Sequence, residues 1–281
     1  MLTPESSIDD IPLLYLDVET TGLNPAYGDR IIEVGALRCE YGEIVGSLEQ
    51  LVNPQRGISS GAFAVNGISN EMLADAPMFH QIIDQLTPLM EGAVIVGHNV
   101  GFDLSFLAAE FAQIGLTLPE PVALDTCRLA RQCFVFPSYS LTRLADFLGI
   151  EVGTAHRAMA DVLVTRELFN RIAYKLWRRG VRTLEAFVQA QGGLPGYEIA
   201  QPRNVPPLVQ EALRRNTLLR LSYTAESGEI TDRLVRPLKL TTLGGNLSIV
   251  AYCYLRHARR NFRLDRIVAM ELVESFDTGG E

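Results

Sequence analysis

The chain has 281 residues and a net charge of −8, and 47% of its residues are hydrophobic. This length and composition provide enough apolar surface for one large domain or two ordinary domains, and they exclude a chain that is mainly disordered. No run reaches 18 consecutive apolar residues and the N-terminal segment lacks the basic and apolar regions of a secretory signal, so we expect neither a transmembrane helix nor a membrane partner.

Cysteine and charge narrow the class of protein further. The four cysteines are scattered and form no CxxC pair: Cys39, Cys127, Cys133 and Cys253. This pattern argues against a zinc site and favours free thiols in a reducing compartment, so we expect a cytoplasmic protein. Residues 1–200 hold 13 Lys and Arg against 24 Asp and Glu, whereas residues 201–281 hold 12 against 9. The acidic part needs cations to bind an anion, and the arginine-rich part is suited to meet a polyanion directly.

The first two thirds of the chain predict a mixed α/β fold. Three strand-like runs, separated by Gly, Asn, Pro and Asp, predict an antiparallel meander at residues 12–19, 30–40 and 42–52. Helical patterns then alternate with short apolar runs. The predicted helices are residues 79–90, 102–115, 140–150, 156–180 and 181–190, and the predicted strands are residues 93–99 and 122–126. This order indicates a mixed sheet flanked by helices.

A change of composition marks a second region. Residues 190–207 are rich in Gly, Pro and Gln and indicate a linker. A short helix is predicted at residues 207–216. Five β-rich runs follow, with the turns ESG, LGG and HARR between them: residues 217–225, 229–242, 246–255, 261–265 and 266–274. They predict a small, strongly bent β-barrel. We therefore divide the chain into a first domain at residues 8–180, a helix and linker at 181–207, and a barrel domain at 208–275.

Two carboxylates stand at the end of the first predicted strand. Asp17 and Glu19 follow the apolar run Leu13–Leu16, and their i, i+2 spacing places both side chains on one face of a strand. Two anions at the end of a buried strand repel each other unless a cation lies between them. Carboxylates without cysteine suit a hard ion such as Mg²⁺ or Mn²⁺.

Three further residues extend this candidate site. GHNVGFD supplies Asp103 at the start of a helix that follows a strand, and HRAMAD supplies His156 and Asp161. Each has an ordinary alternative: a helix N-cap for Asp103, a satisfied surface or core histidine for His156, and a solvated helix position for Asp161. A spacing of five residues does not place His156 and Asp161 on one helical stripe. We therefore expect Asp161 on the helix and His156 in the loop or first turn before it.

In order and spacing, DVETTGL, HNVGFDLSFL and HRAMADV resemble the three motifs of the DEDDh 3′–5′ exonucleases. This family includes the proofreading subunits of bacterial replicative polymerases. The resemblance covers about residues 11–175, with further support from DRIIEVGAL, LVNP and FAVNGISNEMLADAP. It implies an RNase H-like fold and hydrolysis of a terminal phosphodiester with two ions, Mg²⁺ or Mn²⁺. The metal ligands that it implies are Asp17, Glu19, Asp103 and Asp161. His156 matches the general base of the family, and histidine titrates near neutral pH as that role requires.

The same resemblance implies where the substrate binds. The residues that would receive the 3′-terminal nucleotide are Thr20, Thr21, Gly22 and Leu23. Backbone amides near Gly22 would reach the sugar, and Leu23 would press on the last base. In the family the loop written here as AVNGI also approaches the terminal bases, which makes Asn66 and Ile68 weaker candidates. For Leu23 and Ile68 the alternative is ordinary core packing.

Residues 208–273 resemble the WYL domain, a bacterial ligand-sensing module with an SH3-like or Sm-like barrel. The segments LSY, RLVRP, AYC and FRLDRI carry this resemblance, but Leu247-Ser248-Ile249 replaces the tripeptide that names the family. Six residues could converge on one face of the barrel and bind nucleic acid or a nucleotide: Tyr223, Arg233, Tyr252, Arg256, Arg263 and Arg266. The alternative is a solvated face on which Arg266 pairs with Asp265 or Asp232.

These features favour an active, metal-dependent 3′–5′ exonuclease. Its expected substrate is a nucleic acid with a 3′ end, with single-stranded DNA favoured, and its barrel would bind nucleic acid or a regulatory ligand. One alternative is a regulator that uses the exonuclease fold only for binding, although a pure binder has no use for four clustered carboxylates. Another is a proofreading accessory subunit of a polymerase, although the linker shows no convincing clamp-binding peptide.

Overall fold

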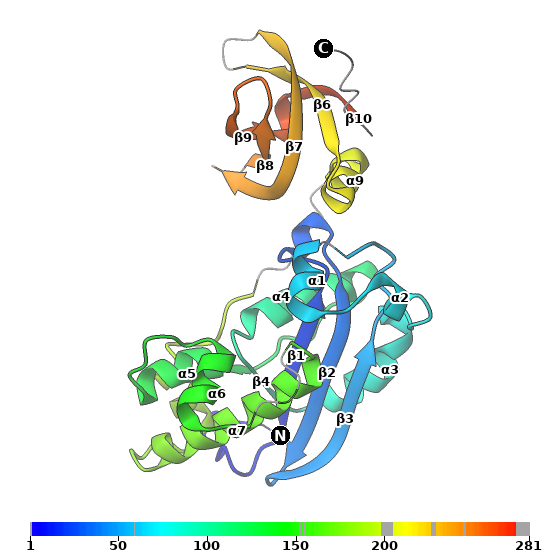
Figure 1. Ribbon diagram of the computed structural model, residues 1–281. Helices are drawn as coiled ribbons and strands as arrows, with labels where there is room; N and C mark the ends of the chain where they lie inside the picture. Colours follow the sequence, from blue (N-terminus) through cyan, green and yellow to red (C-terminus); the bar gives the residue numbers. More distant parts are fainter. Residues whose placement is uncertain are drawn as a thin grey trace. The chain divides into compact units, whose positions relative to one another are not determined.

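The computed structural model describes residues 2–58, 60–151, 153, 156–197, 205–225, 229–243 and 246–273. The chain forms two compact units, Met1–Pro202 and Arg203–Glu281, and each unit has a sheet of its own (Figure 1). None of the helices in these ranges is long and apolar enough to cross a membrane.

The first unit contains a five-stranded mixed sheet with the strand order β3-β2-β1-β4-β5. The strands are β1 (Leu13–Thr20), β2 (Ile31–Glu40), β3 (Glu43–Leu51), β4 (Val94–Gly97) and β5 (Ala123–Asp125). The first three pair antiparallel, whereas β4 pairs parallel with β1 and β5 pairs parallel with β4. The predicted meander and the predicted mixed sheet are therefore confirmed.

Helices cover both faces of this sheet (Figure 1). On one face lie α5 (Thr126–Cys133), α6 (Leu141–Leu148), α7 (Ala158–Trp177) and α8 (Leu184–Ala190), and on the other lie α3 (Phe79–Met90) and α4 (Gly101–Gln113). Tyr15 of β1 packs with the first set, and its neighbours Leu14 and Leu16 pack with the second. Burial on both faces explains why this strand is an unbroken apolar run.

Three helices of this unit have no counterpart in the sequence prediction: α1 (Ser60–Asn66), α2 (Asn70–Leu73) and α5. The first two have seven and four residues, too few to show a helical period. The third begins directly after β5, because Asp125 ends the strand and also caps the helix. Its Oδ1 accepts the backbone N–H groups of Cys127 at 2.9 Å and Arg128 at 3.3 Å.

The second unit consists of α9 (Pro207–Arg215) and an antiparallel sheet with the order β10-β6-β7-β8-β9. Its strands are β6 (Leu218–Thr224), β7 (Ile230–Leu243), β8 (Asn246–Cys253), β9 (Ala258–Arg263) and β10 (Ile267–Val273). The predicted strands are confirmed, but β9 and β10 remain the outer strands in the described part of the chain, so the expected barrel is not closed. The predicted turn HARR is also too long, because His257 turns the chain in a left-handed conformation (φ 49°) and β9 starts at the next residue.

Candidate active site

Strand β1 places two carboxylates on the face of the sheet that α7 covers. Asp17 and Glu19 share this face with Tyr15, which packs against α7, whereas the intervening Val18 points to the opposite core. Both carboxylates are half-buried. The two carboxylates therefore lie on one face of the strand, as their i, i+2 spacing predicts.

Two more carboxylates reach β1 from the first turns of helices. Asp103 lies in the first turn of α4, is 3% exposed, and accepts the Val18 N–H at 3.0 Å through Oδ1. This bond ties α4 to the residue between the two carboxylates of β1. Asp161 lies in the first turn of α7. Four carboxylates from three elements thus meet at one place, although the first and the last of them are 144 residues apart in sequence.

His156 lies just before α7 and not within it. Its side chain is exposed, and its backbone is left-handed with φ 61°, which is rare for a residue other than glycine. Ligand atoms of Glu19, His156 and Asp161 all lie within 4.8 Å of one another. The structure therefore places the imidazole beside the carboxylates, within reach of anything that binds between them.

Burial and mutual repulsion raise the pKa values of the carboxylates. Burial, followed by repulsion from Asp103, Asp161, Glu19 and Glu33, raises the pKa of Asp17 well above its usual range. Burial also raises the pKa of Glu19 to about 7 and that of Asp103 to about 8. Burial raises the pKa of Asp161, while His156 opposes this shift through its charge and its backbone N–H. A cation bound among these acids would offset their repulsion and favour their ionised forms.

The donors at this site fit a hard divalent cation. They are oxygen atoms of carboxylates that repel one another, and oxygen is the ligand that Mg²⁺ and Mn²⁺ prefer. The residues that would hold such ions are Asp17, Glu19, Asp103 and Asp161. His156 lies close enough to act either as a further ligand or as a base toward a water molecule at the site.

Sequence reasoning missed the ion pair that holds the start of α7. Glu33 on β2 pairs with Glu19 across the sheet and is fully buried. Its carboxylate accepts three bonds from the Arg157 guanidinium, at 2.6, 3.0 and 3.1 Å, and a fourth from the Ala158 N–H at 3.0 Å. A charged residue inside the apolar run IIEVGAL was the available signal, because a buried carboxylate needs a partner.

Gly35 of β2 allows the start of α7 to lie close to this strand. It pairs with Asp17 across the sheet, and a Cβ at this position would lie 2.5 Å from the carbonyl carbon of Ala158. Backbone atoms cannot move aside as a flexible side chain can. The start of α7 can therefore lie against β2 only because the strand has a glycine there.

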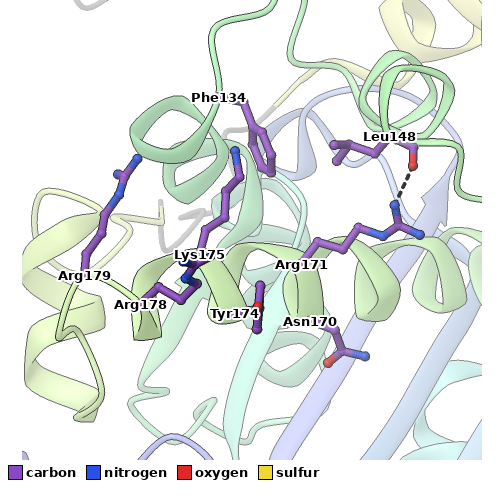
Figure 2. A pocket seen from close by; sticks show the side chains of 8 residues that line it. All are labelled: Phe134, Leu148, Asn170, Arg171, Tyr174, Lys175, Arg178 and Arg179. Atoms are coloured by element: carbon purple, nitrogen blue, oxygen red, sulfur yellow. Dashed lines mark hydrogen bonds between the residues drawn. The ribbon is translucent and has the colours of Figure 1, made fainter.

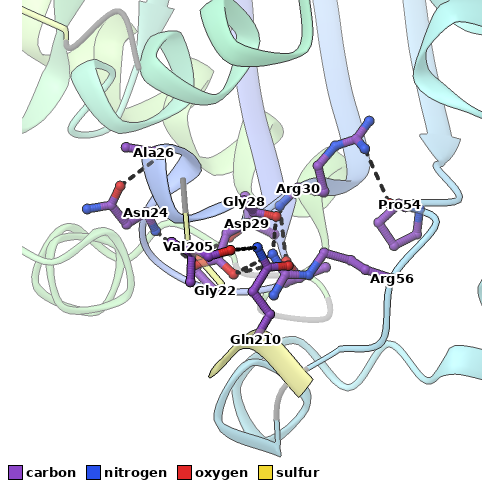
Figure 3. A network of polar contacts seen from close by, with 12 residues as sticks. Gly22, Asn24, Ala26, Gly28, Asp29, Arg30, Pro54, Arg56, Val205 and Gln210 are labelled. Atoms are coloured by element: carbon purple, nitrogen blue, oxygen red, sulfur yellow. Dashed lines mark hydrogen bonds and ion pairs between the residues drawn. The ribbon is translucent and has the colours of Figure 1, made fainter. Parts of the chain in front are cut away.

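The segment that follows β1 forms a hydrogen-bonded loop, part of which is drawn in Figure 3. The Thr20 hydroxyl donates to the Gly22 carbonyl at 2.6 Å, and the Thr21 hydroxyl accepts the Arg30 N–H at 3.0 Å. A Cβ on Gly22 would lie 2.4 Å from the carboxylate of Asp29, so a larger residue here would have to displace that side chain. Asp29 in turn accepts the Asn24 N–H at 3.1 Å and pairs with Arg56 at 3.3 Å.

Two apolar candidates in the predicted substrate site have different positions. Leu23 is 85% exposed in the loop after β1, where a substrate could cover it. Ile68 is fully buried among Ile32, Ile58 and Leu73, so its side chain packs in the core, the alternative that the sequence left open. The expectation of a substrate contact is wrong for the Ile68 side chain.

Asn66 links the loop to the carboxylates. Its amide donates to the Thr20 carbonyl at 3.4 Å, and a bond from its side chain opposes the rise in the pKa of Glu19. Its side-chain oxygen accepts the Ile68 N–H at 3.0 Å. Asn66 therefore positions groups of the site from a buried location.

In the second unit the six predicted residues do not converge on one face. Arg233 pairs with the buried Leu221 across the sheet, and Tyr223 follows two residues later on that same face. Tyr252 lies between two buried residues of β8 and therefore points to the opposite face. Its neighbours across the sheet there are Arg236 and Arg259, both of them exposed arginines that the sequence analysis did not select.

The remaining predicted residues lie at the ends of strands. Arg256 is exposed in the turn between β8 and β9, and Arg266 lies in the short 3₁₀ turn before β10. The Arg263 side chain forms two bonds to Asp265, at 2.6 and 3.0 Å, and its backbone N–H lies 3.3 Å from the Tyr223 hydroxyl. An ion pair at Asp265 thus occurs, as the alternative reading suggested, and Arg263 takes part in it.

Comparison with known proteins identifies the family. The model of the RNase_T family, described as exonuclease, matches residues 14–169, which is more than half of the chain. The chain belongs to the RNase_T exonuclease family. A WYL domain matches residues 205–272. Both matches agree with the resemblances read from the sequence, and the mixed sheet of the first unit confirms the predicted RNase H-like fold.

Relatives of this exonuclease family share the first unit. The chain is 37% identical over 169 residues to the DNA polymerase III PolC-type protein of Caldanaerobacter subterraneus subsp. tengcongensis. The aligned region covers 60% of this chain and 12% of that protein. It is 36% identical over 171 residues to the 3′-5′ exonuclease DinG of Bacillus subtilis, with coverage of 60% and 18%. The structure of Exonuclease X in complex with 5′ overhanging duplex DNA has 27% identity and a TM-score of 0.50, and covers 64% of this chain and 99% of that one. This chain thus spans less than a fifth of the length of these two curated relatives.

Proposed function

We propose that this chain is a metal-dependent exonuclease that removes nucleotides from the 3′ end of nucleic acid, with DNA favoured over RNA. The observation that carries the proposal is the group of four carboxylates with an exposed histidine beside it. A binding module gains nothing from acids that repel one another. A nuclease needs them to hold the ions that accompany a phosphodiester.

Each part of the site then has a role. Asp17, Glu19, Asp103 and Asp161 hold two ions, Mg²⁺ or Mn²⁺, which when bound neutralise the charge of the phosphate and make a water molecule more acidic. His156 accepts the proton of the attacking water, because its ring is exposed within 4.8 Å of Glu19 and Asp161. Among the described residues, His156 is the histidine that groups with carboxylates at the spacing of metal ligands.

The loop after β1 receives the terminal nucleotide in this proposal. Its backbone is fixed by Thr20, Thr21 and Asp29, so the amides near Gly22 are held in place before the substrate binds. The exposed Leu23 covers the last base. A fixed loop loses little entropy on binding, which favours a defined position for the 3′ end.

The preference for DNA rests on similarity. The relatives described above are a DNA polymerase III PolC-type protein and a 3′-5′ exonuclease, and the solved structure contains duplex DNA. These names describe those proteins. For this chain they favour a DNA substrate and 3′–5′ polarity.

We assign the exonuclease domain to residues 8–180, a helix and linker to residues 181–207, and the WYL domain to residues 208–275. The WYL domain binds nucleic acid or a nucleotide in this proposal. Its support is the row of Arg236, Tyr252 and Arg259 across three neighbouring strands, which combines two exposed guanidinium groups with an aromatic ring. Such a row suits stacking with a base and forked bonds to phosphate.

A degradation assay tests the activity. Single-stranded DNA, duplex DNA and RNA carrying a label near either end are incubated with the chain, with and without Mn²⁺ or Mg²⁺. We expect loss of nucleotides one at a time from the 3′ end, only with metal. Asp17→Asn serves as the inactive control, because it removes one metal ligand and leaves the size of the side chain unchanged. Near-normal turnover by this variant would refute the metal site.

A proofreading role is the second candidate, and the similarity to DNA polymerase III PolC-type proteins is the observation that favours it. The chain would then act on mispaired 3′ ends as a partner of a polymerase. Co-purification with a polymerase, together with faster removal of mispaired than paired 3′ nucleotides, would support this role. Equal rates on both substrates and no associated polymerase would exclude it.

A further inference from the structure

A compact set of cations stands out in the acidic first unit. Five of the 13 basic residues in positions 1–200 fall between residues 171 and 182, and no acidic residue occurs from 168 to 184. They occupy the end of α7 and the turn that follows it. Along the axis of α7, Lys175 lies about 20 Å from Asp161, so these cations are separate from the candidate active site.

Three of these cations are held in place by the carboxyl-terminal ends of neighbouring helices. Lys175 Nζ donates to the Cys133 carbonyl at 3.3 Å, and Arg179 Nη1 donates to the Gln132 carbonyl at 2.9 Å. Arg171 donates to the Leu148 carbonyl at the end of α6, as Figure 2 shows. Each interaction uses only part of the donors on the side chain, since lysine carries three and arginine five. Lys175 and Arg179 are therefore fixed in position but retain donors for a ligand, whereas Arg171 also pairs with Glu167 at 2.9 Å.

The same residues line a groove of about 550 Å³ between α7 and the ends of α5 and α6 (Figure 2). We call it the basic groove. Phe134 and Leu148 supply apolar surface, and the Lys175 ammonium lies 4.2 Å from the centre of the Phe134 ring. Tyr174 is 63% exposed beside these cations. Arg178 is exposed, and its guanidinium has no hydrogen bond or ion pair with any residue that the structure describes.

We propose that the basic groove binds a single-stranded segment of nucleic acid at a distance from the reacting 3′ end. Fixed cations would meet the phosphates, and Tyr174 would stack with a base, which is the combination found in grooves that track single strands. The free guanidinium of Arg178 suits forked bonds to a phosphate. This inference rests on the proposed function in one respect, namely that nucleic acid is the substrate.

An acidic protein segment is the competing occupant. Carboxylates would use the cations equally well, but they would leave the exposed ring of Tyr174 without a partner. A nucleotide uses the charges and the Tyr174 ring together. At about 3.4 Å per nucleotide, a stacked strand spans 20 Å with about six nucleotides, so only substrates longer than this could occupy both sites.

Binding is measured by fluorescence anisotropy with a labelled 16-mer of thymidylate, in the full chain carrying Asp17→Asn to prevent degradation. Arg178→Ala removes the cation that has no protein contact, and Tyr174→Ala removes the exposed ring. Arg143→Ala is the matched control, because this arginine is 65% exposed on α6 and does not line the groove. All three side chains are exposed, so unchanged melting temperatures are expected and confirm folding.

Arg178→Ala should make the plot of log affinity against log salt less steep by about 0.7, the contribution of one phosphate contact to a single strand. Tyr174→Ala should weaken binding about fivefold or more, which corresponds to the loss of one stacked base. Both variants should hydrolyse a dinucleotide at the parental rate in the chain with Asp17 intact. Groove-dependent binding without any hydrolysis would refute the proposed activity and still support the basic groove.

Two results would overturn this inference. In the first, both groove variants bind the 16-mer with the parental affinity and salt slope, as Arg143→Ala is expected to do. In the second, a decamer of glutamate displaces the 16-mer in an Arg178-dependent manner while Tyr174→Ala has no effect. The basic groove would then be a site for acidic protein segments.

Discussion

Replacing Glu33 by alanine tests how the start of α7 is held beside the carboxylates of β1. The Glu33 carboxylate is fully buried and accepts four bonds, three from the Arg157 guanidinium and one from the Ala158 N–H. The substitution removes all four at once. It leaves an arginine without its partner and an N–H group at the start of α7 without an acceptor.

The size of the effect follows from the burial of the two partners. Breaking a buried ion pair costs about 3–5 kcal/mol. The Arg157 side chain is 33% exposed, so water stabilises the freed charge, and we expect the lower end, about 3 kcal/mol. A loss of 1 kcal/mol lowers the melting temperature of a domain of this size by about 2–4 °C, so the expected decrease is about 6–12 °C.

The loss of Glu33 also has a stabilising effect on the folded protein, which opposes the loss of the ion pair. Repulsion from Glu33 is among the causes that raise the pKa of Asp17, Glu19 and Asp161. Its removal relieves that repulsion where the neighbouring acids are ionised. In metal-free protein the decrease in melting temperature should therefore be smaller at pH 8 than at pH 5.5.

The activity should also fall, because Asp161 and His156 flank the residues that Glu33 holds. A displacement of about 1 Å costs a reaction of this kind about 100-fold, so we expect kcat on a 3′-labelled oligonucleotide to fall by about that factor. Glu33→Gln keeps an acceptor for the Ala158 N–H and should have a smaller effect on melting. In a double-mutant cycle with Arg157→Ala, the two substitutions should be strongly non-additive.

Glu40→Ala is the matched control. Glu40 lies on the same strand and pairs with Arg38 at 2.9 Å, but its side chain is 37% exposed, so the loss should be below about 1 kcal/mol. If Glu33→Ala keeps both the parental melting temperature and the parental kcat, the ion pair does not hold the site together. A large loss of stability with unchanged kcat would limit its role to folding.

Three further predictions concern the site and the second unit. His156→Ala should lower the chemical rate by about 10²–10⁴-fold with little change in Mn²⁺ affinity, measured by calorimetry, whereas a loss of Mn²⁺ binding would make the histidine a ligand. In metal-free protein the melting temperature should fall as pH rises from 5.5 to 8.5, because the raised pKa values of Glu19 (about 7) and Asp103 (about 8) favour proton binding in the folded state. Asp17→Asn should make the melting temperature less dependent on pH and should raise it at pH 8. A profile that is flat for the parental protein would contradict the repulsion. Deletion of residues 201–281 should leave cleavage of a dinucleotide unchanged but weaken binding to a long single strand and reduce its salt dependence, and unchanged binding would remove the second unit as a nucleic-acid contact.

Local patterns predicted the elements of the first unit well, because each signal lies within a few residues. The apolar run before Asp17 predicts a strand covered on both faces, and the structure buries Tyr15 on one side and Leu14 on the other. The spacing of His156 and Asp161 predicts that only the second is helical, as the structure shows. Motif order also brought the four carboxylates together before any geometry was known.

The sequence did not reveal the strand register or the contacts between residues that are far apart in the chain. Glu33 could be noticed as a charge within an apolar strand, but its partner is 124 residues away and becomes apparent only once β2 and α7 are packed. In the second unit, the face on which a residue lies depends on the register of β7 and β8. A shift of one residue reverses it, so the predicted convergence of Tyr223 and Tyr252 on one face was wrong.

Net charge gave an incomplete account of where a polyanion could bind. An excess of 11 acidic residues in positions 1–200 suggested that the first part has few cations to hold a strand and that the second must supply them. The structure separates the charges within the first unit. Its acids include the four at the candidate active site, where bound ions would offset them, while five cations gather at the end of α7 with three of them fixed on helix ends. The field that a strand meets depends on this separation and falls off within about 10 Å in salt, so a domain with a negative total can still present a positive groove to nucleic acid.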